Sequence, residues 1–224
     1  PTRSLLAFQE CAIRYLVTGE TPYLQAGKRV LAAMAELYTT DPNRAPTWPE
    51  ETNARFIVAA WDAVEEAPVI NDEERLRFTN VILRFVYSNI AKTSGYADLE
   101  TNDTIVWNHT TFPLLGLYWG GRYFRRYYDC AYMDLFLNKA AGAFRGQEKS
   151  WKPQCDADSY LTITMGHTIE YALAEGRMAF FETGNIRRYA DYLIGISDNR
   201  GWAPGFGDSG MVRTTSIPDA GLPY

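Results

Sequence analysis

The sequence predicts an all-α protein built from antiparallel helical hairpins. Apolar residues return at three- and four-residue intervals along most of the 224-residue chain, and the alternating pattern of strands is almost absent. Glycine-containing turns separate several of the helical stretches. Hydrophobic residues make up 46% and charged residues 22% of the chain, a composition that is sufficient for one sizeable core. We therefore expect residues 1–224 to form a single helical domain or part of one.

Four helices are predicted in the first part of the chain. Pro22 fits the first turn of one of them, and a segment rich in Pro and Asn at 41–46 ends it. Asn71 can cap another, whose first turn is acidic and so suits the positive end of a helix dipole. The predicted helices cover 5–17, 21–38, the stretch from Trp48-Pro49 to about 66, and 71 to about 91.

Four more helices are predicted after a loop at 93–103. Their ranges are about 106–127, 129–144, 158–174 and 185–197. Pro113 lies inside the first of these patterns, so it either kinks that helix or marks its first turn just after His109. In the second case His109 lies at a helix N-terminus.

A faint internal repeat favours helical hairpins. The segment 15–19, ending in Thr18-Gly19, resembles 180–184, ending in Thr183-Gly184, and Tyr118-Trp119-Gly120-Gly121 is a looser third copy. In each copy we expect glycine to supply the turn between two antiparallel helices. Hairpins at this spacing suggest an α/α toroid whose inner helices line a cleft. The predicted eight helices would form an incomplete ring.

Charge and composition exclude several classes of partner. The formal net charge of −5 offers no broad basic surface for nucleic acid, although Arg122, Arg125 and Arg126 form a basic cluster that suits a local anionic ligand. No run of about 18 apolar residues occurs, so no membrane span is expected. The aromatic content of 14% suits carbohydrate stacking as well as core packing.

The cysteines do not form a metal-binding pattern. They lie far apart and no C-x-x-C pair occurs, so a zinc site is not expected, and buried free thiols are favoured over a single disulfide. The three are Cys11, Cys130 and Cys155.

Asn108, His109 and Tyr160 are the candidate catalytic residues. Asn108-His109 stands at the start of an aromatic, glycine-containing stretch, and Tyr160 opens another helical stretch 51 residues later (160 minus 109). An amide, an imidazole and a phenol are the groups needed to neutralise a carboxylate and to move a proton beside it. Capping or core packing is the structural alternative for each of the three.

Further motifs stand around these residues in a recognisable order. Asn53-Ala54-Arg55 precedes Trp61, Tyr160 ends the segment 156–160, and Trp-Ala-Pro-Gly-Phe-Gly-Asp-Ser occupies 202–209. Together with Asn108-His109, these motifs resemble the heparinase II/III-like and alginate-lyase-like polysaccharide lyases over about residues 48–210. The resemblance implies the toroid fold and cleavage of a uronate-containing polysaccharide. The chain departs from the usual pattern in having Thr after the Asn-His pair.

The resemblance also implies a mechanism, β-elimination. Asn108 and His109 would neutralise the uronate carboxylate, and Tyr160 would serve as base, as acid toward the leaving oxygen, or as both. A nearby cation such as Arg122 or Arg125 would lower the pKa of the tyrosine. No metal or other cofactor is required. The residues expected to contact substrate are Arg55, Trp107, Arg122, Trp151, Asp158, His167 and Trp202.

Two other functions remain open at the level of sequence. A toroid glycoside hydrolase would use paired carboxylates, for which Asp156, Asp158 and Asp208 are available. A non-catalytic helical module would bind a glycan or a protein on its concave surface. His167 also has a structural alternative, as a core histidine on the same helix face as Tyr160.

The resemblance adds two expectations about the whole protein. Family members continue into a C-terminal β-sandwich, so we expect a longer protein in which such a domain packs on the toroid. Acidic polysaccharides are met outside the cytoplasm, so a secreted or periplasmic location is expected.

Overall fold

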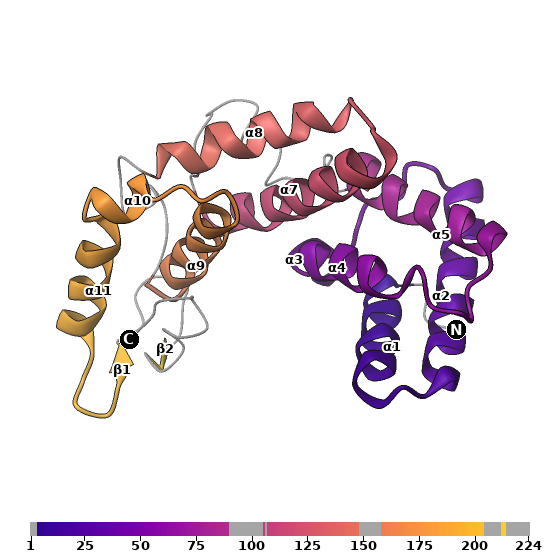
Figure 1. Ribbon diagram of the computed structural model, residues 1–224. Coiled ribbons are helices and arrows are strands. Elements are labelled where there is room, and N and C mark those ends of the chain that lie inside the picture. The colour runs from indigo at the N-terminus through magenta and orange to yellow at the C-terminus, as the bar shows by residue number, and fades with distance from the viewer. Residues whose placement is uncertain (1–3, 90–104, 106, 148–157, 204–211, 214–224) are drawn as a thin grey trace. The chain divides into compact units, whose positions relative to one another are not determined.

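The computed structural model describes residues 4–89, 105, 107–147, 158–203 and 212–213 (Figure 1). Among these residues the regular elements are helices apart from one pair of two-residue strands, which confirms the predicted all-α class. The chain divides into two compact units. Unit 1 comprises residues 1–96 and 112–137, and unit 2 comprises residues 97–111 and 138–224. The divisions therefore fall within two of the helices.

The N-terminal helices are α1 (Leu5–Thr18), α2 (Thr21–Thr40), α3 (Trp48–Thr52), α4 (Ala54–Val64) and α5 (Asp72–Arg84), followed by the π-helix η1 (Phe85–Asn89). The later helices are α7 (Asn108–Tyr128), α8 (Met133–Gly146), α9 (Asp158–Ala174), α10 (Ala179–Glu182) and α11 (Asn185–Ile196). Strands β1 (Trp202–Ala203) and β2 (Val212–Arg213) pair antiparallel.

Helices α1 and α2 lie side by side and are joined by a tight turn (Figure 1). The side chain of Ser4 accepts a hydrogen bond from the N–H of Leu6 and caps α1. Gly19 ends the helix with a φ of 72°, and its N–H donates to the carbonyl of Tyr15 at 2.7 Å. This left-handed conformation favours glycine, as the repeat predicts. Gly184, with a φ of 79°, has the same conformation just before α11.

Each unit has its own apolar core. In unit 1 the fully buried ring of Trp61 from α4 packs against Phe8 of α1 and Phe78 of α5, with both pairs of ring centroids 6.2 Å apart. Those contacts tie three helices together. In unit 2 helices α9, α10 and α11 share a cluster of buried residues, which are Leu161, Met165, Ile169, Ala172, Phe180, Tyr189 and Leu193.

Two predicted helix ranges need correction. The helix expected from Trp48-Pro49 to about 66 is broken at Asn53, where the backbone leaves the helical conformation with a φ of −105° and a ψ of 8°. The side-chain amide of Asn53 donates to the carbonyl of Pro49 at 2.8 Å, in addition to the backbone N–H of Asn53 at 3.2 Å. The helix expected at 129–144 begins only at Met133, because Asp129 has a φ of 46° and so breaks the helical conformation after α7.

The glycines at 120 and 121 do not form a turn. They lie inside α7, which begins at Asn108 and carries Pro113 in its interior. A Cβ at Gly120 would lie 2.7 Å from Cγ1 of Val86, and one at Gly121 would lie 3.0 Å from Cδ2 of Leu137. These glycines therefore serve close helix packing, not chain reversal.

Candidate functional site

The first turn of α7 is joined to α9 by a buried hydrogen bond. The hydroxyl of Thr111 donates to the carbonyl of Asn108 at 2.8 Å and lies 2.7 Å from Nδ1 of His167. A hydroxyl has a single proton, which here is used on the carbonyl, so Nδ1 of His167 must be the donor in the second bond. The two bonds are satisfied together when His167 carries a proton on Nδ1.

Asn108 and His109 differ in their exposure. Asn108 is only 4% exposed, whereas His109 is half-buried. The imidazole of His109 lies against the indole of Trp107, with ring centroids 4.5 Å apart and an angle of 31° between the planes. His109 is therefore the member of the Asn-His pair that is presented, together with an aromatic ring, near the surface.

Tyr160 is half-buried in the first turn of α9. It precedes His167 by seven residues (167 minus 160), which correspond to about 10 Å along a helix axis. The hydrogen bond from α9 to Thr111 is made by His167 and not by Tyr160. Tyr160 belongs to the same helix and the same unit as this contact. A shared cleft of Asn108, His109 and Tyr160 stays a prediction.

His167 itself lies in the interior. It is only 6% exposed, and its hydrogen bond to Thr111 gives it a structural role. The hydrogen bond favours the core alternative over direct contact with substrate, because Nδ1 of His167 is already engaged by Thr111 inside unit 2. Its effect on the site is to hold the start of α7, which carries Asn108 and His109.

The other expected substrate-binding residues fall into three groups. Arg55 and Arg122 belong to unit 1, where Arg55 lies 4.2 Å from the ring of Phe56 and Arg122 donates to the Tyr118 hydroxyl at 2.5 Å. Trp202 lies in unit 2, in strand β1, and is 36% exposed. Trp151 and the side chain of Asp158 lie outside the part of the chain that the structure describes, as do Asp156 and Asp208, the other carboxylates of the hydrolase alternative.

Arg125, the other cation expected near Tyr160, forms ion pairs with two aspartates. Its guanidinium hydrogen-bonds to Asp129 and, at 3.0 Å, to Asp134, all within unit 1. The sequence did reveal the basic cluster, but it did not reveal these partners.

Sequence reasoning missed a cluster of ionisable groups in unit 1. The buried carboxylate of Glu65 accepts hydrogen bonds from the hydroxyls of Tyr123 and Tyr128, the latter at 3.3 Å. Burial raises the pKa of Glu65, and the two hydrogen bonds oppose that rise. Burial and the bond to Glu65 together raise the pKa of Tyr123 far above its usual value. The Tyr123 phenol therefore stays protonated and acts as a donor to Glu65.

Sequence reasoning also missed two neighbouring glutamates with opposite pKa shifts. Burial favours the protonated form of Glu50, but hydrogen bonds from the backbone of Thr47, from Arg44 and from the backbone of Leu5 outweigh it and lower the pKa. Glu51 is also buried, and this burial raises its pKa to about 7. Sequence position alone could not separate these two residues.

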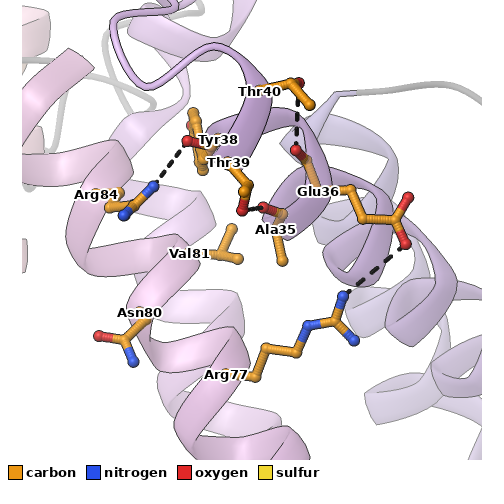
Figure 2. A pocket seen from close by; sticks show the side chains of 9 residues that line it. All are labelled: Ala35, Glu36, Tyr38, Thr39, Thr40, Arg77, Asn80, Val81 and Arg84. Carbon is orange, nitrogen blue, oxygen red and sulfur yellow. Dashed lines mark hydrogen bonds and ion pairs between the residues drawn. The ribbon is translucent and has the colours of Figure 1, made fainter.

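A groove lies between α2 and α5 in unit 1, with a volume of about 570 Å³ (Figure 2). Arg77 and Arg84 from α5 stand at its two ends, and Figure 2 shows Val81 between them. The sequence gives no signal for this groove, because its walls come from helices that are separated along the chain.

Comparison with family models, curated proteins and solved structures finds no match to the chain. In the part of the chain that the structure describes, no helix is both long and apolar enough to cross a membrane. The described residues also contain no group of three or more His, Cys, Asp or Glu side chains that could hold a metal ion.

Proposed function

We propose that this chain is the α/α-toroid part of a polysaccharide lyase that cleaves a uronate-containing polymer by β-elimination. The observation that carries the proposal is the Thr111–His167 hydrogen bond, at 2.7 Å. It ties the turn that presents Asn108 and His109 to the helix that carries Tyr160, within one compact unit. The order of motifs in the sequence supplies the reaction class.

The proposed reaction uses each residue according to its exposure. His109, half-buried beside Trp107, makes the direct contact with the uronate carboxylate. Asn108, almost fully buried, supports the carboxylate from the base of the site. Neutralising that charge makes the proton on the adjacent C5 carbon more acidic, because the enolate-like state that forms is stabilised.

Tyr160 moves the protons in this proposal. Its phenolate takes the C5 proton, the electron pair of the C–H bond forms the C4–C5 double bond, and the C4–O4 bond breaks. The leaving oxygen then receives a proton from the tyrosine, so that the phenolate is restored. The products are a new chain end and an unsaturated uronate, and neither a metal nor an oxidant takes part.

The toroid and the cellular setting belong to the same proposal. The α1–α2 hairpin closed by Gly19 and the left-handed Gly184 before α11 support stacked helical hairpins. The motif order further implies a longer protein with a C-terminal β-sandwich and a secreted or periplasmic location.

The test is incubation with a panel of uronate polymers, followed by the ultraviolet absorbance of the conjugated product. Tyr160→Phe keeps the ring and removes the hydroxyl, so turnover should fall by about 10²-fold or more while the fold survives. His109→Ala should also lose most of its activity. The matched control is Tyr192→Phe, a half-buried tyrosine of the same unit that should keep normal turnover.

The outcomes separate the alternatives. New reducing ends without the absorbing product, lost in Asp156→Asn or Asp158→Asn but kept in Tyr160→Phe, would identify a glycoside hydrolase and overturn the proposal. Binding of a uronate polymer without any cleavage by the complete protein would instead favour a glycan-binding module.

A further inference from the structure

The groove between α2 and α5 combines an apolar floor with a polar rim (Figure 2). The apolar lining includes the half-buried Ala35 together with Tyr38 and Val81, which are almost fully buried, and the rim includes two arginines, Glu36, two threonines and Asn80. Ligand sites commonly have this composition, in which apolar surface supplies contact area and a few polar groups fix orientation. The chemistry of the rim then decides which ligand the groove suits.

Arg84 is held in place at one end. Its Nη1 donates to the carbonyl of Tyr38 at 2.8 Å, in the last turn of α2, where carbonyls lack helical partners. A guanidinium has five N–H donors in a planar fork. This one contact therefore orients the group and leaves further donors for a carboxylate, which arginine binds through paired hydrogen bonds.

Arg77 stands at the other end and is only weakly engaged. Its Nη2 lies 4.0 Å from Oε1 of Glu36, with the two side chains 49% and 75% exposed. An ion pair that is so long and so exposed contributes little. Arg77 precedes Arg84 by seven residues (84 minus 77), so the two charges lie on one side of α5, about 10 Å apart along its axis.

The threonines supply acceptors. The hydroxyl of Thr39 donates to the carbonyl of Ala35 at 2.9 Å, and that of Thr40 donates to the carbonyl of Leu37 at 3.0 Å. Their protons are therefore used within α2, and their lone pairs can accept from ligand hydroxyls. The groove thus offers cations for carboxylates, an amide from Asn80, acceptors for hydroxyls and an apolar floor for ring faces.

We infer that this groove is a non-catalytic subsite for an acidic saccharide, with Arg84 and Arg77 each binding a carboxylate. A sugar acid presents carboxylates, hydroxyls and apolar ring faces together, whereas a simple inorganic anion would leave the floor and the threonines unused. The choice of a uronate polymer as ligand rests on the proposed function.

Binding can be measured by calorimetry with the full chain carrying Tyr160→Phe, so that turnover does not consume the ligand. The probe is a 1,4-linked glucuronate trisaccharide, and the matched neutral probe is a 1,4-linked glucose trisaccharide. We expect the acidic probe to bind at least about tenfold more tightly, and added salt to weaken it.

Single substitutions locate the site. Arg84→Gln and Arg77→Gln should each weaken binding of the acidic probe about tenfold, since each removes a charge-assisted contact. Glu36→Gln should strengthen binding several-fold, because it removes a competing carboxylate and frees Arg77. Arg187→Gln is the matched control, since that exposed arginine of α11 also has a long ion pair, at 3.7 Å to Asp191, and should have no effect.

Arg84 also joins α2 to α5, so thermal unfolding of Arg84→Gln is measured alongside binding. Arg77, whose described partner is Glu36, keeps the test valid even if Arg84→Gln fails to fold. Equal affinity for both probes, tighter binding of a polyglutamate peptide, or unchanged binding in Arg77→Gln and Glu36→Gln would overturn the inference.

The subsite and the lyase reaction can fail separately. Arginine-dependent binding by a protein that yields no unsaturated product would keep the subsite and refute the proposed reaction. Lyase activity in the wild type together with unchanged binding in both arginine variants would keep the proposed reaction and refute the subsite.

Discussion

Thr110 and Thr111 offer a matched pair for testing how the start of α7 is held. Both side chains are fully buried and adjacent in sequence. Thr111 makes two hydrogen bonds, to the Asn108 carbonyl and to His167. The Thr110 hydroxyl has no hydrogen-bond partner among the residues that the structure describes. Replacing each by Val changes a hydroxyl for a methyl at nearly constant shape, so only the hydrogen bonding differs.

The expected magnitudes follow from these contacts. Thr111→Val leaves Nδ1–H of His167 buried without its acceptor, at a cost of about 1–3 kcal/mol, and removes one bond to the Asn108 carbonyl, worth about 1 kcal/mol. We therefore expect the free energy of unfolding to fall by about 2–4 kcal/mol. Thr110→Val removes a hydroxyl whose burial is uncompensated, so its free energy of unfolding should stay equal or rise by about 1 kcal/mol.

Urea denaturation of both variants and wild type measures the difference, provided that the m-values agree. Turnover on the active uronate polymer is the second readout, and it should fall in Thr111→Val because Asn108 and His109 lose their anchor. Equal free energies of unfolding for the two valine variants would refute the hydrogen bond from Nδ1–H of His167 to Thr111 and the role of His167 in holding the start of α7.

Two further predictions concern stability. Gly120→Ala should destabilise unit 1 by about 1–3 kcal/mol, because the new Cβ would lie 2.7 Å from Val86. Gly142→Ala on α8 should stabilise the protein by about 0.5–1 kcal/mol, because a Cβ there meets nothing within 4 Å. Thermal unfolding of the two variants measures the difference, and equal shifts would contradict the packing argument. Burial raises the pKa of Glu51 from 4.5 to about 7, so the folded chain holds a proton that the unfolded chain has released between these values. The contribution of protonated Glu51 to stability is fully present below pH 4.5 and is lost as the pH rises through about 7. Its loss lowers the free energy of unfolding by up to about 3 kcal/mol. Glu51→Gln should flatten that slope in denaturation curves measured across this window, and a slope that persists would show that another group is responsible.

Local signals were enough for much of the helix assignment. The predicted helix at 158–174 coincides with α9, and Asn71 caps α5 as expected, with its side chain accepting from the N–H of Glu74. Gly19 ends α1 in the left-handed conformation. These features depend on residues within a few positions of one another, where hydrophobic period, capping and backbone preference act without the rest of the chain.

The sequence by itself determined the all-α class, most helix positions and the residue types from which a site can be built. Only the tertiary structure decided which of those residues meet. Thr111 contacts His167 across 56 residues, Glu65 contacts Tyr123 across 58, and Arg84 contacts Tyr38 across 46. The tertiary structure also decided that Gly120 serves helix packing. It decided as well that Asn108 is buried whereas His109 lies near the surface. The physical reason is that helical periodicity states which face of a helix is buried, whereas the partner of that face depends on how separate helices pack.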